Sequence, residues 1–202
     1  MPPEIEDLGR APYEAVLRHM RSLHTAVHRC EAAGRVLLVE HDPVFTAGRA
    51  TPTGDLLPGI LPIERGGRIT YHGPGQLVVY PILRLPRPDI RDWLRRLESF
   101  GVAIAASFGI AATPSVDGTG VFVGSRKFAS IGVAVKHWIN LHGIGINVAM
   151  DLAPWHTIRP CGLSPDIMTD LSTALGRTLD MADARAAARE AVSLLADIDQ
   201  PL

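Results

Sequence analysis

The chain has 202 residues, of which 47% are hydrophobic and 20% are charged, and its formal net charge is −1. This length predicts one domain spanning 1–202, with enough apolar surface to bury a core unaided. The composition excludes a disordered chain, the lack of a long apolar run excludes a membrane-spanning helix, and the balanced charge argues against a nucleic-acid or polybasic membrane-binding surface.

The N-terminal segment MPPEIEDLGR is acidic and lacks the apolar stretch of a secretory signal, so we expect a cytoplasmic protein with free thiols. Residues 12–33 have apolar residues at helical spacing and predict a helix that carries Cys30 on its apolar side and ends before Gly34. The apolar run 35–41 predicts a buried strand. Residues 42–62, with four prolines and three glycines, are predicted as a loop.

The middle of the chain alternates strands with one helix. Residues 69–71 and 76–83 predict strands around a Gly-Pro-Gly turn, and 89–108 predicts a helix. Residues 112–148 contain short apolar runs between turns, typical of an antiparallel meander, and 181–198 predicts an alanine-rich helix. Helices near the ends and strands between them indicate an α+β fold, with the helices on one side of a largely antiparallel sheet.

The segment RGGRITYHGPGQ (65–76) contains four glycines in twelve residues. Glycine lets the backbone approach a ligand closely and offer its N–H groups, but it also serves ordinary tight turns. The segment is neither a P-loop nor a dinucleotide fingerprint, because G-K-[ST] and G-x-G-x-x-G are absent. The sequence therefore leaves two interpretations of this segment, a ligand-binding loop and a pair of tight turns.

Two further residues have the chemistry of nucleophilic catalysis. Cys161 lies between Pro160 and Gly162, where a thiolate is a good nucleophile if a cation lowers the pKa of the thiol. Lys127, in the apolar run GSRKFASIG, is a candidate for that cation and for a proton carrier. The alternatives are a buried, inert thiol and a solvent-exposed lysine.

Histidines offer two other arrangements. A Cys–His pair could be formed by Cys161 with His72 or His142, and all three could formally hold zinc. No spacing in the sequence supports a metal site, so we expect none.

Taken together, these segments resemble the lipoyl(octanoyl) transferases, the lipoate-protein ligase B family. The resemblance is carried by LVEHDPVFTAGR (38–49), RGGRITYHGPGQ, GVFVGxxKxASIG, LHGIGINVxxDL and IxPCGL, which occur in order between about residues 35 and 165. It implies a biotin/lipoate ligase-like α+β fold, with a mixed, largely antiparallel sheet packed against helices. It also implies transfer of an octanoyl or lipoyl group from acyl-carrier protein to a lysine ε-amine, without ATP, metal or other cofactor.

The partners implied are octanoyl-acyl-carrier protein as donor, and as acceptors the apo lipoyl domains of 2-oxoacid dehydrogenase complexes and the glycine cleavage H protein. The resemblance makes Cys161 the acyl-thioester nucleophile and Lys127 the residue that lowers the pKa of its thiol. It implies that the acyl substrate is bound by Arg65, Gly66, Gly67, Arg68, Ile69, Thr70, Tyr71, His72, Ser130, Ile131, Gly132, Gly143, Ile144 and Gly145. We expect glycines 66, 67, 73 and 75 to make room for the acyl chain.

The sequence leaves two other functions to weigh: an ATP-dependent lipoate or biotin ligase of the same fold, and a non-catalytic module that binds lipoyl domains or acyl-carrier protein. The biotin-ligase segment G-R-G-R-x-G-R is absent, and Lys127 together with Cys161 favours catalysis. Ala134 stands where the family often has arginine, which would loosen a contact with the carrier. A surface for the acidic carrier, or simply a solvated helix face, is predicted from Arg84, Arg87, Arg91, Arg95 and Arg96.

Overall fold

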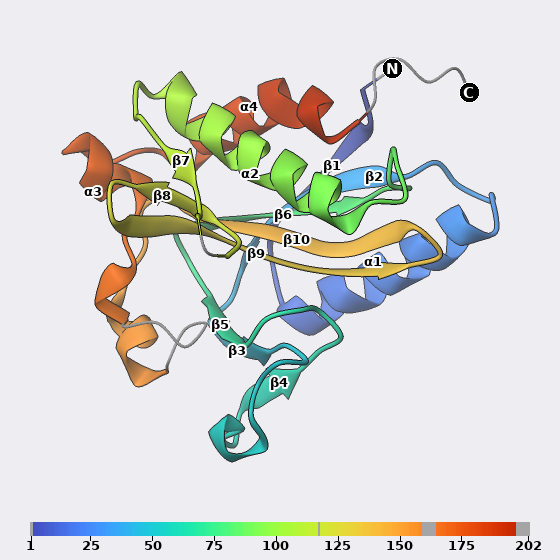
Figure 1. The fold of residues 1–202 in the computed structure, drawn as a ribbon, viewed down its shortest axis with the longest axis horizontal. Helices are drawn as coiled ribbons and strands as arrows, with labels where there is room; N and C mark the ends of the chain where they lie inside the picture. The colour runs from blue at the N-terminus through green and yellow to red at the C-terminus, as the bar shows by residue number, and fades with distance from the viewer. Residues whose placement is uncertain (1, 117, 159–164, 197–202) are drawn as a thin grey trace.

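The computed structural model describes residues 2–116, 118–158 and 165–196 of the chain. A seven-stranded sheet of order β1-β2-β6-β10-β9-β8-β7 forms its centre, and a three-stranded sheet, β4-β3-β5, lies beside it (Figure 1). The strands are β1 (Glu4–Ala11), β2 (Arg35–His41), β3 (Val44–Ala47), β4 (Ile60–Pro62), β5 (Ile69–His72), β6 (Gln76–Ile82), β7 (Thr113–Pro114), β8 (Val121–Val123), β9 (Arg126–Lys136) and β10 (Ile139–Asn147).

The helices are α1 (Tyr13–His28), α2 (Ile90–Ser107), α3 (Leu171–Leu175) and α4 (Met181–Ala191), with 3₁₀ turns η1 (Thr53–Asp55), η2 (Ala153–Thr157), η4 (Pro165–Ile167) and η5 (Val192–Leu195). In the described part of the large sheet, β1 pairs with β2 in parallel and the other strand pairs are antiparallel. The α+β class with a mixed, largely antiparallel sheet is confirmed.

Helices cover both faces of the large sheet, so the expectation that they share one side is wrong (Figure 1). In β2, Val36 and Leu38 pack in the core beneath α2 and α4, whereas Leu37 and Val39 pack in a second core against α1. Successive side chains of a strand point to opposite faces. A strand that is apolar at every position therefore needs cover on both sides.

Element boundaries depart from the sequence prediction where the local pattern is weak. The edge strand β1 was not predicted, because EIEDLGRA is largely polar and half exposed. The predicted loop 42–62 contains β3 and β4, and Pro62 is tolerated at the end of β4, an edge strand. The helix predicted over 181–198 ends at Ala191 and continues as η5.

The first helix ends earlier than predicted, at His28, and Cys30 lies beyond it with a positive φ of 58° and an exposed side chain. Cys30 is therefore not part of the apolar side of α1. The second helix agrees with the prediction, since the Asp89 side chain accepts hydrogen bonds from the backbone N–H groups of Arg91 and Asp92 and so fixes its start.

Candidate functional site

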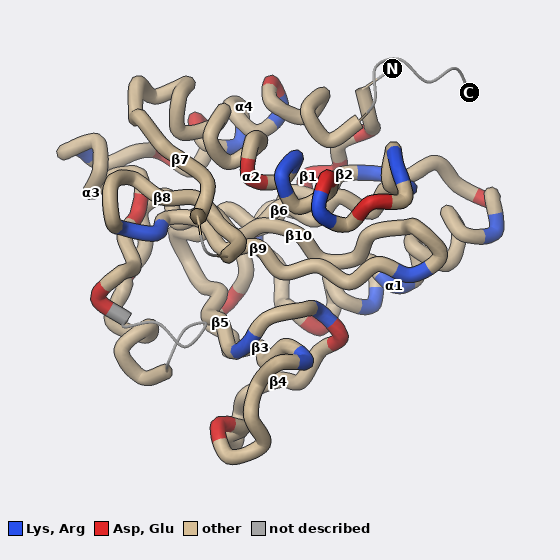
Figure 2. Tube along the Cα trace, viewed as in Figure 1, with Lys and Arg blue, Asp and Glu red and all other residues tan. Residues whose placement is uncertain are grey.

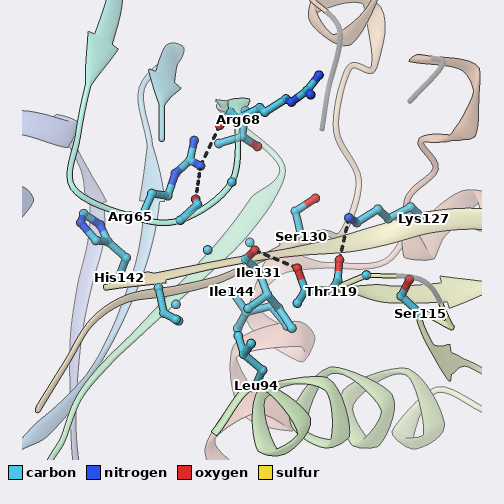
Figure 3. Close-up of a pocket in the computed structure, with 18 of the residues that line it drawn as sticks. Arg65, Arg68, Leu94, Ser115, Thr119, Lys127, Ser130, Ile131, His142 and Ile144 are labelled. Carbon is cyan, nitrogen blue, oxygen red and sulfur yellow. Dashed lines mark hydrogen bonds between the residues drawn. The ribbon is translucent and has the colours of Figure 1, made fainter. Parts of the chain in front are cut away.

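A cavity of about 860 Å³ opens between the 65–68 loop, strands β9 and β10, and the first half of α2 (Figure 3). Predicted substrate-binding residues that line it are Arg65, Gly66, Gly67, Arg68, Thr70, His72, Ser130, Ile131, Gly132, Gly143, Ile144 and Gly145. Ile69 and Tyr71 are not in its lining. Their side chains alternate with Thr70 and His72 along β5, and Tyr71 packs instead on Phe45 and Trp155.

The 65–68 loop is shaped by the buried guanidinium of Arg65. Its Nη1 donates to the carbonyls of Gly66 (2.9 Å) and Arg68 (2.8 Å), and its Nη2 donates to the carbonyl and hydroxyl of Thr46 (both 2.9 Å). Gly67 adopts a positive φ of 81°, and the Gly66 N–H donates to the Val133 carbonyl at 2.9 Å. Arg65 therefore ties its own loop to Thr46 of β3, and the Gly66 N–H joins the loop to β9.

Two of the expected binding stretches lie next to each other on β9 and β10. Gly143 pairs with Gly132, Ile144 with Ile131, and Gly145 with Ser130. The missing side chain of Gly132 leaves room for Arg65, because a Cβ there would lie 2.8 Å from the Arg65 Cδ. Ile131 and Ile144 project into the cavity towards Leu94 of α2 and form an apolar surface (Figure 3).

Glycines 73 and 75 do not line the cavity, so the expectation that they make room for an acyl chain is wrong. A Cβ at Gly73 would collide with the ring of Tyr71, and one at Gly75 with the backbone of Ala149. Gly75 also has a positive φ of 84°. These two glycines serve the close packing of the β5–β6 turn.

Lys127 is only 5% exposed, so the alternative of a solvent-exposed lysine is wrong. Lys127 lines the cavity, and its Nζ donates to the Thr119 carbonyl at 2.9 Å and lies 5.7 Å from the centre of the Phe122 ring (Figure 3). At Lys127, β9 pairs with β8 on one side and is bridged to Met168 on the other, and the Thr169 N–H donates to the Lys127 carbonyl at 2.9 Å.

Cys161 lies outside the described residues, so its position relative to Lys127 stays a prediction. The described chain that follows it does reach this site. Ile167 lines the cavity, and Met168 is bridged to Lys127.

The two histidines of the alternative arrangements are both buried. His72 Nδ1 lies 2.7 Å from Gln76 Oε1, and Gln76 Nε2 donates to Asn147 Oδ1 at 2.9 Å. Burial, together with the neighbouring His41, lowers the pKa of His72 to about 3. His142 Nε2 lies 3.7 Å from the Glu64 carboxylate, and the pKa of Glu64 is held well below its ordinary value by His142 and by Arg21.

The cavity also has lining residues that no motif pointed to. Tyr13 comes from α1, Leu94 from α2, and Thr119 from the segment before β8. Tyr80 also lines the cavity and shares a hydrogen bond of 3.0 Å with His41 Nε2. These residues are far apart in sequence, and the spacing of a helix or strand does not reveal which of its apolar positions faces a cavity.

Two general properties concern the described residues alone. No group of three or more His, Cys, Asp or Glu side chains there is arranged to hold a metal ion. In the same residues, no helix combines the length and apolar character needed to span a membrane.

Ala134, where a contact with the carrier was expected to be loosened, is buried in the core against α1.

Comparison with known proteins identifies a family and several similar sequences. Residues 12–193 match the family described as the lipoyl protein ligase A/B catalytic domain. An octanoyltransferase from Geobacter metallireducens is 42% identical over 186 residues, covering 90% of this chain and 87% of the relative. An octanoyltransferase from Pseudomonas entomophila is 43% identical over 178 residues, covering 85% and 82% respectively.

Solved structures show the same fold at low sequence identity. A lipoate-protein ligase A bound with ATP superposes with a TM-score of 0.76 at 16% identity, covering 96% of this chain and 85% of that one. The biotin protein ligase of Aquifex aeolicus with biotin and ATP gives a TM-score of 0.57 at 13% identity, covering 94% and 68%. The lipoate/biotin ligase architecture and the resemblance on which it was based are thus confirmed, and the chain belongs to the lipoyl protein ligase A/B catalytic domain family.

Proposed function

We propose that this chain is an octanoyltransferase that carries the acyl group on Cys161 and uses Lys127 as its proton carrier. The observation that carries the proposal is the buried Lys127 Nζ at a cavity walled by Ile131, Ile144 and Leu94, in a chain whose relatives at 42–43% identity are named octanoyltransferases. A reactive amine beside an apolar cavity suits a long acyl chain that ends in an activated carbonyl group.

In the first step, the Cys161 thiolate attacks the thioester carbonyl of octanoyl-acyl-carrier protein. The bond from that carbonyl to the phosphopantetheine sulfur breaks, and the departing thiolate takes a proton from Lys127. Exchange of one thioester for another is close to thermoneutral, so the protein has to position the partners and stabilise the oxyanion. Backbone N–H groups near Cys161 and Gly162 are the candidates for that stabilisation.

In the second step, the ε-amine of a lysine on a lipoyl domain attacks the Cys161 thioester. The neutral Lys127 amine takes the proton that the attacking nitrogen loses, and the Cys161 thiolate leaves. A free lysine has a pKa of about 10.4 and is mostly protonated at neutral pH, so the acceptor amine first loses one proton to solvent, and Lys127 takes the second proton as the amide forms. Each step returns Lys127 to the form that the other step requires.

The cavity provides binding energy for the acyl chain. An octanoyl group contains six methylenes, and burying each of them contributes about 0.8 kcal/mol, or about 5 kcal/mol in total. Ile131 and Ile144, which pair across β9 and β10, give the acyl chain an apolar surface to pack against. The roles of the cavity residues as acyl-binding residues are part of this proposal.

Octanoyl-acyl-carrier protein as donor and apo lipoyl domains as acceptors, including those of 2-oxoacid dehydrogenase complexes and the glycine cleavage H protein, also belong to the proposal. The proposal also states that the chain acts as a single domain, needs no metal or ATP, and is located in the cytoplasm. The thioester is already activated, so no nucleotide is needed to drive the transfer.

Intact-mass measurement tests the mechanism. After incubation with octanoyl-acyl-carrier protein, the wild-type chain should gain the mass of one octanoyl group, and apo lipoyl domain should then discharge it. Cys161→Ser should accumulate no labile thioester and should lose transfer by at least 100-fold. Transfer that needs ATP and free octanoate would instead indicate a ligase, and binding without any transfer would indicate a non-catalytic module.

A further inference from the structure

The Lys127 amine and the carboxylate of Glu98 lie at the two ends of one peptide unit. Lys127 Nζ donates to the Thr119 carbonyl at 2.9 Å, and the Gly120 N–H, in the same peptide, donates to Glu98 Oε1 at 3.2 Å. Figure 3 shows the first of these bonds, with Thr119 reaching from the segment before β8 towards Lys127 on β9. The helix α2 is thereby connected to the amine through a single peptide group.

Glu98 is an unusual residue for its place in the fold. It lies on the inner side of α2 between Leu97 and Phe100 and is only 7% exposed. A buried carboxylate is costly unless it is hydrogen-bonded, and a nonpolar residue would fill this position at lower cost. The proposed reaction does not use Glu98 directly, so its burial needs another explanation.

The peptide that Glu98 holds is closely fitted to the lysine. Gly120 has a positive φ of 130°, and a Cβ there would lie 2.5 Å from Lys127 Cε and 2.9 Å from Nζ. A glycine peptide has broad rotational freedom, so its orientation has to be fixed from outside. The hydrogen bond from the Gly120 N–H to Glu98 holds the peptide directly, while the Thr119 hydroxyl donates to the Ile131 carbonyl at 3.5 Å, so the Glu98 bond acts on the plane in which the Thr119 carbonyl points.

We infer that Glu98 is a positioning residue that sets the location of the Lys127 amine by orienting the Thr119–Gly120 peptide. The inference rests on the proposed function, in which that amine transfers protons. The role is geometric: Glu98 accepts a hydrogen bond, and no proton passes through the peptide. A displacement of about 1 Å in a reacting group can cost about 100-fold in rate, so orientation alone carries a large effect.

The test compares Glu98→Ala with Glu98→Gln, which keeps an Oε1 acceptor for the Gly120 N–H but removes the charge. With octanoyl-acyl-carrier protein as donor, Glu98→Ala should lower kcat about 10- to 100-fold with KM within about twofold, and it should shift the pH profile of kcat. Glu98→Gln should remain within about threefold of wild type. Ile104→Ala, which removes a fully buried side chain elsewhere on α2, controls for loss of stability.

A second readout does not depend on catalysis. The rate at which an amine-reactive reagent such as acetic anhydride modifies Lys127, followed by peptide mass spectrometry, should change in Glu98→Ala and stay near wild type in Glu98→Gln and Ile104→Ala. The inference is overturned if Glu98→Ala has the wild-type pH profile and labelling rate, or loses no more activity than Ile104→Ala. A wild-type chain inactive with octanoyl-acyl-carrier protein, but with labelling that follows Glu98, would overturn the proposed function alone.

Discussion

Burial determines which of the polar side chains around the cavity can exchange protons. His72 is enclosed, and its Nδ1 lies within hydrogen-bond distance of the Gln76 carbonyl oxygen, which makes Nδ1 the protonated nitrogen of a neutral ring. With a pKa of about 3, His72 is neutral at pH 7 and is a weak base. These properties count against His72 as the partner of Cys161 and favour the assignment of proton transfer to Lys127.

The depressed pKa of His72 predicts how stability depends on pH. An unfolded histidine has a pKa of about 6.5, so below that pH the unfolded chain binds a proton that folded His72 does not. His72 therefore destabilises the fold as the pH falls from about 6.5 towards about 3, by about 1.4 kcal/mol per pH unit.

The substitution His72→Asn, which keeps a donor for Gln76, should remove this dependence. The free energy of unfolding of the wild type minus that of His72→Asn, measured with urea, should decrease by about 2 kcal/mol between pH 7 and pH 5. A comparison at pH 8, where both chains are neutral at this position, gives the baseline. A constant difference across the three pH values would contradict the burial of a neutral His72.

At the scale of elements, prediction succeeded where a local pattern was strong. The apolar runs of β2 and β6 and the helical spacing of apolar residues in α2 were found from the sequence, because periodicity is a local signal. The polar edge strand β1 lacks such a signal. The pairing of Gly132 with Gly143 also could not be predicted, since strand register depends on distant partners.

That register predicts an unequal tolerance of two glycines in the site. A Cβ at Gly132 would lie 2.8 Å from the Arg65 Cδ, whereas a Cβ at Gly66 would lie 3.6 Å from the Val133 carbonyl oxygen, an ordinary contact. Gly132→Ala should therefore displace Arg65 and cost about 1–3 kcal/mol in the free energy of unfolding. Gly66→Ala should change it by less than about 0.5 kcal/mol, measured in the same urea titration. Equal effects would mean that Arg65 can move without loss.

At the scale of the whole molecule, the motifs predicted most of the residues that line the cavity from β5, β9 and β10, but not the walls that the helices supply. Most of the expected binding residues meet at one cavity, because β5, β9 and β10 carry the motifs and lie around it. The walls that α1 and α2 supply could not be predicted, since Tyr13 and Leu94 reach the cavity only through tertiary packing. The side from which a carrier protein approaches is likewise a property of the whole surface.

The arginines predicted as a carrier surface divide into two groups in the structure. Arg96 forms an ion pair with Asp92 at 2.8 Å, and Arg84 Nη1 donates a hydrogen bond to the His137 carbonyl at 3.5 Å. Arg87, Arg91 and Arg95 are exposed and form no ion pair within the described part of the chain, and Figure 2 shows basic residues near the start of α2. Arg91 and Arg95 directly follow Ile90 and Leu94, which line the cavity, so an acidic carrier bound to these arginines would lie next to the cavity.

Charge reversal tests this orientation. The double variant Arg91→Glu/Arg95→Glu should raise KM for octanoyl-acyl-carrier protein about 10-fold with kcat within about twofold, because repulsion weakens the encounter and leaves the chemistry unchanged. The increase should shrink at about 0.5 M salt, where exposed charges are screened. The matched control Arg18→Glu/Arg29→Glu places the same charge change on and just after α1, which covers the opposite face of the sheet, and should leave KM near wild type. If both double variants raise KM equally, net charge and not a local surface governs the encounter, and the carrier does not dock at α2.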